Sequence, residues 1–149
     1  MNKTFAVITS LLLAVSAAPA PSGKREASEM DITKFTASSN LNGNGASISY
    51  DIAIPGAIST HCSYTDSTST TTMPSISFVA CDDDAIEWEF HQDPAQPGGE
   101  GQYRIVITYA DGSGSKVAGY HEWNPHDFPQ QDSATVYTGA STFIITDLQ

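Results

Sequence analysis

The segment His-Glu-Trp-Asn-Pro-His, residues 121 to 126, holds the residue types of a zinc protease. In those enzymes two histidines of a helical His-Glu-x-x-His motif bind the metal, and the glutamate is the general base. Here the spacing is wrong, because His126 follows His121 by five positions and Pro125 prevents the helix that would place both imidazoles on one side. We therefore predict that His121 and His126 are strand-end and loop residues without a metal.

A pair of carboxylates occurs in Ile-Glu-Trp-Glu-Phe-His, residues 86 to 91. Successive side chains of a strand point to opposite faces, so Glu87, Glu89 and His91 are predicted to share one face, with Trp88 on the other. Glycosidase carboxylates lie about 5 to 9 Å apart, and neighbours on one strand face about 7 Å, so distance alone permits this chemistry. A substrate cleft normally takes its carboxylates from different strands, and we interpret these residues as a solvated sheet face.

Three consecutive aspartates, Asp82, Asp83 and Asp84, follow Cys81. Carboxylates bind calcium, but this ion takes about six to eight oxygen ligands, and no loop has the spacing of an EF-hand. We interpret the three residues as a turn between two strands. The chain also has no nucleophile elbow, phosphate-binding glycine loop or Cys-x-x-Cys pair, so its motifs predict no catalytic residue, cofactor or metal ligand.

The elements that position these side chains are predicted to be strands. Apolar residues recur at every second position, for example at Ile48, Tyr50, Ile52 and Ile54, which is the period of strands with one buried face. The expected strands are residues 32–37, 47–54, 60–64, 75–80, 86–90, 102–110, 115–123 and 141–148. Turn signals rich in Gly, Pro, Asn and Asp separate several of them. The sequence therefore predicts one all-β domain of about eight antiparallel strands, either a sandwich or a partly closed barrel.

The N-terminal part of the sequence predicts export. A short positive start, an apolar run at residues 5 to 15 and small residues after it are typical of a signal peptide, assigned to residues 1–18 with cleavage near 17–20. The run is shorter than the roughly 20 residues that span a bilayer. Residues 19–30 contain Lys24-Arg25 followed by Glu-Ala, which resembles a pro-segment released by a dibasic endoprotease of the fungal secretory pathway. The alternative is a solvated charge pair in a linker. The domain is residues 31–149, and we expect a secreted, extracellular protein.

Charge is distributed very unevenly along the chain. All seventeen Asp and Glu residues lie at or after Glu26. Cleavage behind Arg25 would leave three cationic side chains, Lys34, Arg104 and Lys116, against seventeen anionic ones, a formal net charge of −14. Such a surface repels phosphate backbones and anionic lipid headgroups, so we expect no nucleic acid or membrane partner. A protein partner with a basic surface fits this charge; alternatively, the acidity only keeps a secreted protein in solution.

The two cysteines, Cys62 and Cys81, would most simply pair with each other in an exported chain. The alternative is two free thiols in an oxidising compartment. Closing a loop of about twenty residues would stabilise the fold by about 3 kcal/mol in the chain-entropy description. We therefore predict one disulfide that joins the third strand region to the end of the fourth.

Seven short motifs follow one another in a characteristic order: ITKFTASS, HCSY, VAC, IEWEFHQDP, YRIVITYADGSG, YHEWNPHDF and VYTGASTFII. Their order resembles that of the Alternaria-major-allergen-like family of small secreted fungal proteins, which includes elicitors of the plant hypersensitive response. The likeness covers residues 31 to 147. Members commonly have a further cysteine after the first strand and another that opens the second, where this chain has Ser39 and Ala46. The resemblance thus implies that only the Cys62–Cys81 bridge remains.

The same resemblance implies a β-barrel or sandwich that works outside the cell, often at the interface with a host plant, with no cofactor and no catalytic residues. We therefore predict a secreted, non-enzymatic effector or elicitor that binds, or is recognised by, extracellular host components. The alternative is an extracellular glycan-binding or glycan-cleaving protein, with Glu87 and Glu89 as its carboxylates and exposed aromatic side chains as a sugar platform. Burial of Trp88 in the core would favour the elicitor.

Overall fold

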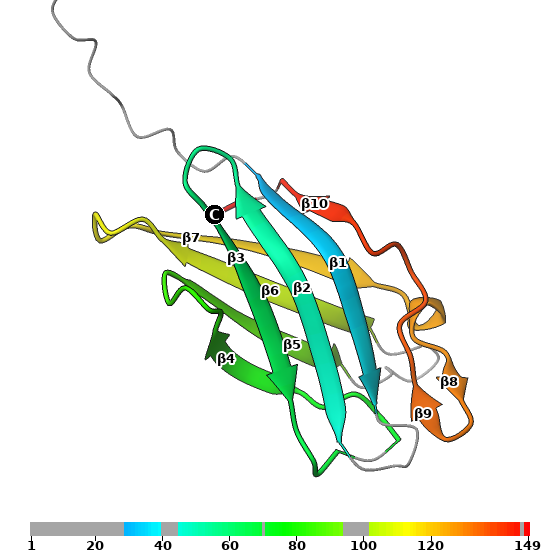
Figure 1. Ribbon diagram of the computed structural model, residues 1–149. Coiled ribbons are helices and arrows are strands. Elements are labelled where there is room, and N and C mark those ends of the chain that lie inside the picture. The colour runs from blue at the N-terminus through cyan, green and yellow to red at the C-terminus, as the bar shows by residue number, and fades with distance from the viewer. Residues whose placement is uncertain (1–28, 40–44, 70, 94–101, 147) are drawn as a thin grey trace, which may run out of the picture.

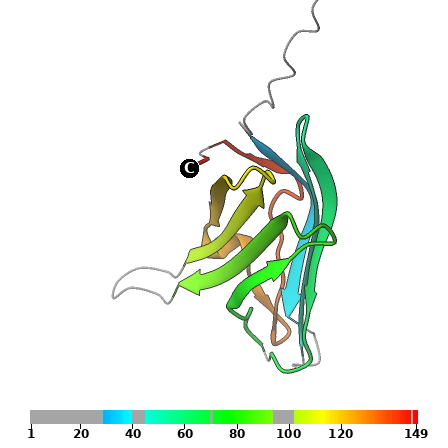
Figure 2. The same cartoon turned by 90° about the vertical axis from the view of Figure 1, so that its left-hand side faces the viewer.

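The computed structural model describes residues 29–39, 45–69, 71–93, 102–146 and 148–149. The predicted signal peptide and pro-segment, with Lys24 and Arg25, lie outside these ranges. Within them the chain forms two main antiparallel sheets that pack face to face (Figure 1, Figure 2). The all-β prediction is confirmed, and of its two forms the structure has the sandwich, because the sheets do not close into a barrel.

Each main sheet has four strands. The first has the order β10-β1-β2-β3 and consists of β1 (Met30–Ser39), β2 (Ala46–Ile54), β3 (Ile58–Thr65) and β10 (Phe143–Ile145). The second has the order β4-β5-β6-β7 and consists of β4 (Ile76–Ala80), β5 (Ile86–Asp93), β6 (Gln102–Ala110) and β7 (Lys116–Trp123). These are the eight predicted segments.

Three short elements between β7 and β10 were not predicted. They are the 3-10 turn η1 (Pro125–Asp127) and the small hairpin of β8 (Gln130–Gln131) and β9 (Ala134–Thr135). A strand of two residues is too short to show an alternating pattern, so periodicity could not reveal it.

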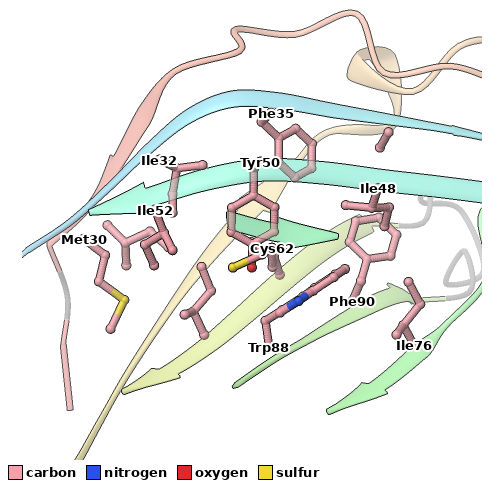
Figure 3. Packing of buried hydrophobic residues seen from close by; sticks show 14 of the residues in the cluster. Met30, Ile32, Phe35, Ile48, Tyr50, Ile52, Cys62, Ile76, Trp88 and Phe90 are labelled. Carbon is pink, nitrogen blue, oxygen red and sulfur yellow. The ribbon is translucent and has the colours of Figure 1, made fainter. Parts of the chain in front are cut away.

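The core lies between the two sheets and is rich in aromatic rings (Figure 3). Tyr50 of β2 meets Trp88 of β5 edge to face, with ring centroids 5.4 Å apart. Trp88 has no exposed surface, and Trp123 of β7 is also buried. Phe35 of β1 stacks on Trp123 at 4.8 Å and so joins the first sheet to the last strand of the second. Burial of such rings supplies most of the driving force for folding of a domain this small.

The chain ties the two sheets together at both sides of the sandwich. On one side a disulfide joins Cys62 of β3 to Cys81, directly after β4, which confirms the predicted pairing. On the other side the backbone of Gln149 exchanges two hydrogen bonds of 2.8 Å with Ala118 of β7. β10 therefore pairs with β1 of the first sheet, and Gln149 pairs with β7 of the second.

Ser39 and Ala46, the positions where the resemblance places a second disulfide, lie directly opposite each other in the β1–β2 ladder, and both are buried. The Ser39 hydroxyl donates to the carbonyl of Thr71 at 3.1 Å and accepts a bond of 2.7 Å from the backbone N–H of Thr135. A buried hydroxyl thus holds a loop and β9 against the end of β1. Hydrogen bonds therefore hold the end of β1 at this site.

We expect Ser39→Ala to lower the free energy of unfolding by about 1–3 kcal/mol, because it leaves the buried N–H of Thr135 without its partner. Urea unfolding followed by tryptophan fluorescence measures this loss. Ser38→Ala is the matched control: its hydroxyl lies on the outer face, 3.3 Å from that of Ser47, and the change should stay within about 0.5 kcal/mol. Equal midpoints for the two variants would contradict the role of the Ser39 hydroxyl.

Candidate functional site

The outer face of the second sheet carries the predicted carboxylates. Glu87, Glu89 and His91 lie on one face of β5, opposite the buried Trp88, as the alternation predicted. Glu87 Oε2 is 3.2 Å from Lys116 Nζ, and Glu89 Oε2 is 3.2 Å from His91 Nε2. Glu87 therefore forms an ion pair with Lys116, and Glu89 lies beside the imidazole of His91 on the same sheet face.

A shallow depression of about 200 Å³ lies on the same face, over β6 and β7. Its lining includes Arg104, Val106, Ala118, Tyr120 and Gln149. Tyr120 is 47% exposed and lies directly across from Val106, which in turn lies across from Glu89. The sequence did not indicate Tyr120 as a site residue. Glu89, Val106 and Tyr120 become neighbours only through the register of β5, β6 and β7.

His121 and His126 are not brought together as metal ligands. His121 faces inward at the side of the sandwich, where its ring stacks on that of Phe143 at 4.3 Å and meets Trp123 at 4.8 Å. Burial lowers the pKa of His121, so the ring is neutral at neutral pH. His126 belongs to the 3-10 turn η1. Among the described residues, no group of three or more His, Cys, Asp and Glu side chains is placed to hold a metal ion.

Asp82, Asp83 and Asp84 form the turn between β4 and β5, as predicted, and all three are exposed. The N–H of Asp82 donates to the carbonyl of His61 at 2.9 Å, which adds a backbone bond beside the disulfide. Asp83 accepts the N–H of Ala85 through its carboxylate at 3.0 Å, and this closes the turn. The Asp83 carboxylate therefore has a structural role, whereas Asp82 and Asp84 are exposed to solvent.

A second constellation lies on the outer face of the first sheet and was not predicted. We call Ser49, Asp51, His61 and Lys34 the β2–β3 cluster. Asp51 Oδ1 lies 2.7 Å from His61 Nδ1, and His61 Nε2 lies 3.4 Å from the hydroxyl of Ser49. The second carboxylate oxygen of Asp51 lies 2.8 Å from Lys34 Nζ. These residues form a Ser-His-Asp chain of contacts with a lysine at its acidic end.

Strand geometry explains how these residues meet. Ser49 and Asp51 are two positions apart on β2, so they share a face, and the tight turn at Gly56, with φ of +77°, places His61 of β3 directly opposite Asp51. Folding the sequence into a hairpin about Gly56 would have revealed this pair. Lys34 lies in a β-bulge of β1, with φ of +55°, and this irregularity had no signal in the sequence pattern.

The electrostatics of the cluster keep Asp51 ionised. Hydrogen bonds from Lys34 and from His61 hold the pKa of its carboxyl below the usual value. In the His61 tautomer that carries its proton on Nδ1, this N–H donates to Asp51, and the lone pair of Nε2 then faces the Ser49 hydroxyl. The contact can therefore draw the hydroxyl proton of Ser49 toward the imidazole.

In comparisons with known proteins, no family model matches this chain and no curated protein matches it. Within the described ranges, no helix has the length and apolar character needed to cross a membrane. The disulfide is compatible with an oxidising, extracellular setting.

Proposed function

We propose that this protein is a secreted, non-enzymatic binding protein of the effector or elicitor type, which recognises an extracellular partner with a basic contact surface. The motif order that resembles the Alternaria-major-allergen-like family supports this class. The observation that carries the proposal is the pairing of the cationic side chains. Each Lys and Arg in the described part of the chain lies beside a carboxylate. The pairs are Lys34–Asp51, Lys116–Glu87 and Arg104–Glu122.

Because the three cations are matched in this way, the remaining carboxylates set the sign of the surface field. Asp82 and Asp84 contribute to it as exposed charges in a turn. A field of one sign steers an oppositely charged partner and raises the association rate by about 10- to 1000-fold, an effect that salt screens. Charge complementarity therefore favours a basic partner over an anionic one.

The burial of the tryptophans also supports the proposal over the glycan alternative. Trp88 and Trp123 are 0% and 4% exposed, so neither is available as a sugar-stacking platform. The carboxylates of Glu87 and Glu89 lie on one strand and are matched by Lys116 and His91, an arrangement that differs from two catalytic carboxylates facing each other across a cleft. Tyr120 and the depression beside it are the feature that favours glycan binding.

The experiment is to immobilise residues 26–149, recover host extracellular proteins, and measure the association rate of the tightest binder as a function of salt. We expect the rate to fall at least about 10-fold between 0.1 M and 1 M salt, because the Debye length shrinks from about 10 Å to about 3 Å. Asp82→Asn combined with Asp84→Asn removes two exposed charges and should lower the rate at 0.1 M salt. Asp83 is left intact because it closes the turn.

Ser59→Ala combined with Ser63→Ala is the control, since it alters two exposed residues and no charge. It should leave the association rate unchanged. An association rate that does not change with salt would overturn the proposal. The negative charge would then serve only to keep the protein in solution. Retention on a wall polysaccharide that is lost in Tyr120→Ala would instead support the glycan alternative.

A further inference from the structure

We propose that Ser49 is an activated nucleophile that accepts one acyl group from an activated ester, with His61 as its general base and Asp51 as the residue that orients His61. This is a covalent site separate from the charge-steered binding proposed above. The inference rests on the order of contacts in the β2–β3 cluster, since a Ser-His-Asp triad is recognised by geometry and roles and not by sequence position.

The contacts have the order that the chemistry needs. Asp51 Oδ1 lies 2.7 Å from Nδ1 of His61, and the Ser49 hydroxyl lies 3.4 Å from Nε2 of the same ring. The second distance is longer than an ideal O–H···N bond, and such contacts are often loose before substrate binds. Ser49 and His61 are both partly exposed, so an ester in solution can reach them.

The position of Lys34 is a second and independent observation. A non-glycine residue rarely adopts a positive φ, yet Lys34 has φ of +55° inside a bulge of β1. The bulge brings its ammonium to 2.8 Å from Asp51 Oδ2, so both carboxylate oxygens of Asp51 are occupied and its orientation is held. Bulges commonly redirect side chains beside active sites. Lys34 acts through Asp51 and is thus a positioning residue.

Acylation would transfer the acyl group from the ester oxygen to the oxygen of Ser49. The Ser49 oxygen attacks the carbonyl carbon of the ester while its proton passes to Nε2 of His61. The new bond joins the Ser49 oxygen to the acyl carbon, and the bond from that carbon to the alcohol or phenol oxygen breaks. The leaving oxygen departs with the electron pair of that bond and takes the proton back from His61. The products are the acyl-serine and the free alcohol or phenol.

The surroundings of the cluster limit the reaction to one acyl group. β2 lies between β1 and β3, so its backbone N–H groups are directed into the two ladders and do not form an oxyanion hole above the sheet. An acyl-serine on this face would lose its acyl group slowly, because hydrolysis needs the same stabilisation of a tetrahedral oxyanion. A reactive ester, with a good leaving group, is the substrate class that this site can accept.

The experiment treats residues 26–149 with 4-nitrophenyl acetate and follows both nitrophenolate release and the acetylated peptides by mass spectrometry. We expect a burst of about one nitrophenolate per chain beyond lysine acetylation, with the acetyl group on Ser49. General-base assistance contributes about 100- to 10,000-fold in enclosed sites, so on this open face we expect Ser49 to react at least about 10-fold faster than Ser47. Ser47 is the internal reference because it lies on the same face of β2 and contacts Ser38 instead of a histidine.

Ser49→Ala should abolish the burst, and His61→Gln should reduce the rate at Ser49 to that at Ser47. Asp51→Asn should slow the reaction because the amide no longer fixes the His61 tautomer, whereas Ser47→Ala should leave the burst unchanged. Equal acetylation of Ser49 and Ser47 in the wild-type chain would overturn the proposal without need of any variant. Continued release well beyond one equivalent that depends on Ser49 would overturn the limit to a single acyl group.

Discussion

Removal of the Cys62–Cys81 bridge should lower the free energy of unfolding by about 2–5 kcal/mol, the usual loss for a native disulfide of a small secreted domain. The bridge connects β3, the last strand of the first sheet, to the end of β4, the first strand of the second. It is therefore a covalent tie between the two sheets, beside the backbone bond from Asp82 to His61.

The change to make is Cys62→Ala together with Cys81→Ala, because a single substitution would leave a reactive thiol. Cys62 is fully buried, so alanine avoids placing an unpaired hydroxyl in the core. Chemical unfolding of this variant and of wild type, each with and without reductant, gives the measurement. Reduction should destabilise only the wild type and bring it close to the variant. Two titratable thiols in the folded, unreduced wild-type protein would refute the bridge itself.

The second large effect is expected at Phe35. The substitution Phe35→Ala should lower the free energy of unfolding by about 3–5 kcal/mol. The ring of Phe35 lies at the meeting point of four others, with centroid distances of 5.9 Å to Tyr50, 4.8 Å to Trp123, 4.9 Å to Tyr137 and 5.6 Å to Phe143. Tyr50 belongs to β2, Trp123 to β7 and Phe143 to β10, and Tyr137 lies just after β9. Loss of the ring would leave a cavity in the core where these four rings meet.

Phe78→Ala is the matched control, since it removes the same ring from a position that is 48% exposed on β4. Its effect should be within about 0.5 kcal/mol, as for most surface substitutions. Thermal unfolding by circular dichroism would report both variants. A Phe35→Ala protein that unfolds within a few degrees of Phe78→Ala would show that the aromatic cluster contributes little to stability.

Phe35 also marks the place where alternation along β1 breaks. Met30 and Ile32 point inward at even positions, whereas Phe35, Ala37 and Ser39 point inward at odd positions, and the bulge at Lys34 accounts for the change. A strand of residues 32–37 was predicted correctly, but a strict period of two would have placed Phe35 on the outer face. A single extra residue reverses the facing of every side chain that follows it.

The sequence by itself determined where the eight main strands lie and which side chains most of them bury. Alternation in β2 and β5 was enough to predict that Tyr50 lies on a buried face and that Trp88 lies on the face opposite to Glu87. The predicted turn at Asp82–Asp84 and the pairing of the two cysteines follow from equally local signals, namely turn composition and cysteine count. Period and turn chemistry are properties of neighbouring residues, so a linear chain displays them.

Only the tertiary structure decided which distant residues meet. The Ser49–His61 contact needs the exact register of one hairpin, and the bonds from Ser39 to Thr71 and Thr135 join residues 32 and 96 positions apart. The two bonds of Gln149 to Ala118 likewise depend on how the last segment crosses from one sheet to the other. Such contacts form where many weak packing preferences of the whole core are satisfied together, and no local pattern of residue types encodes that balance.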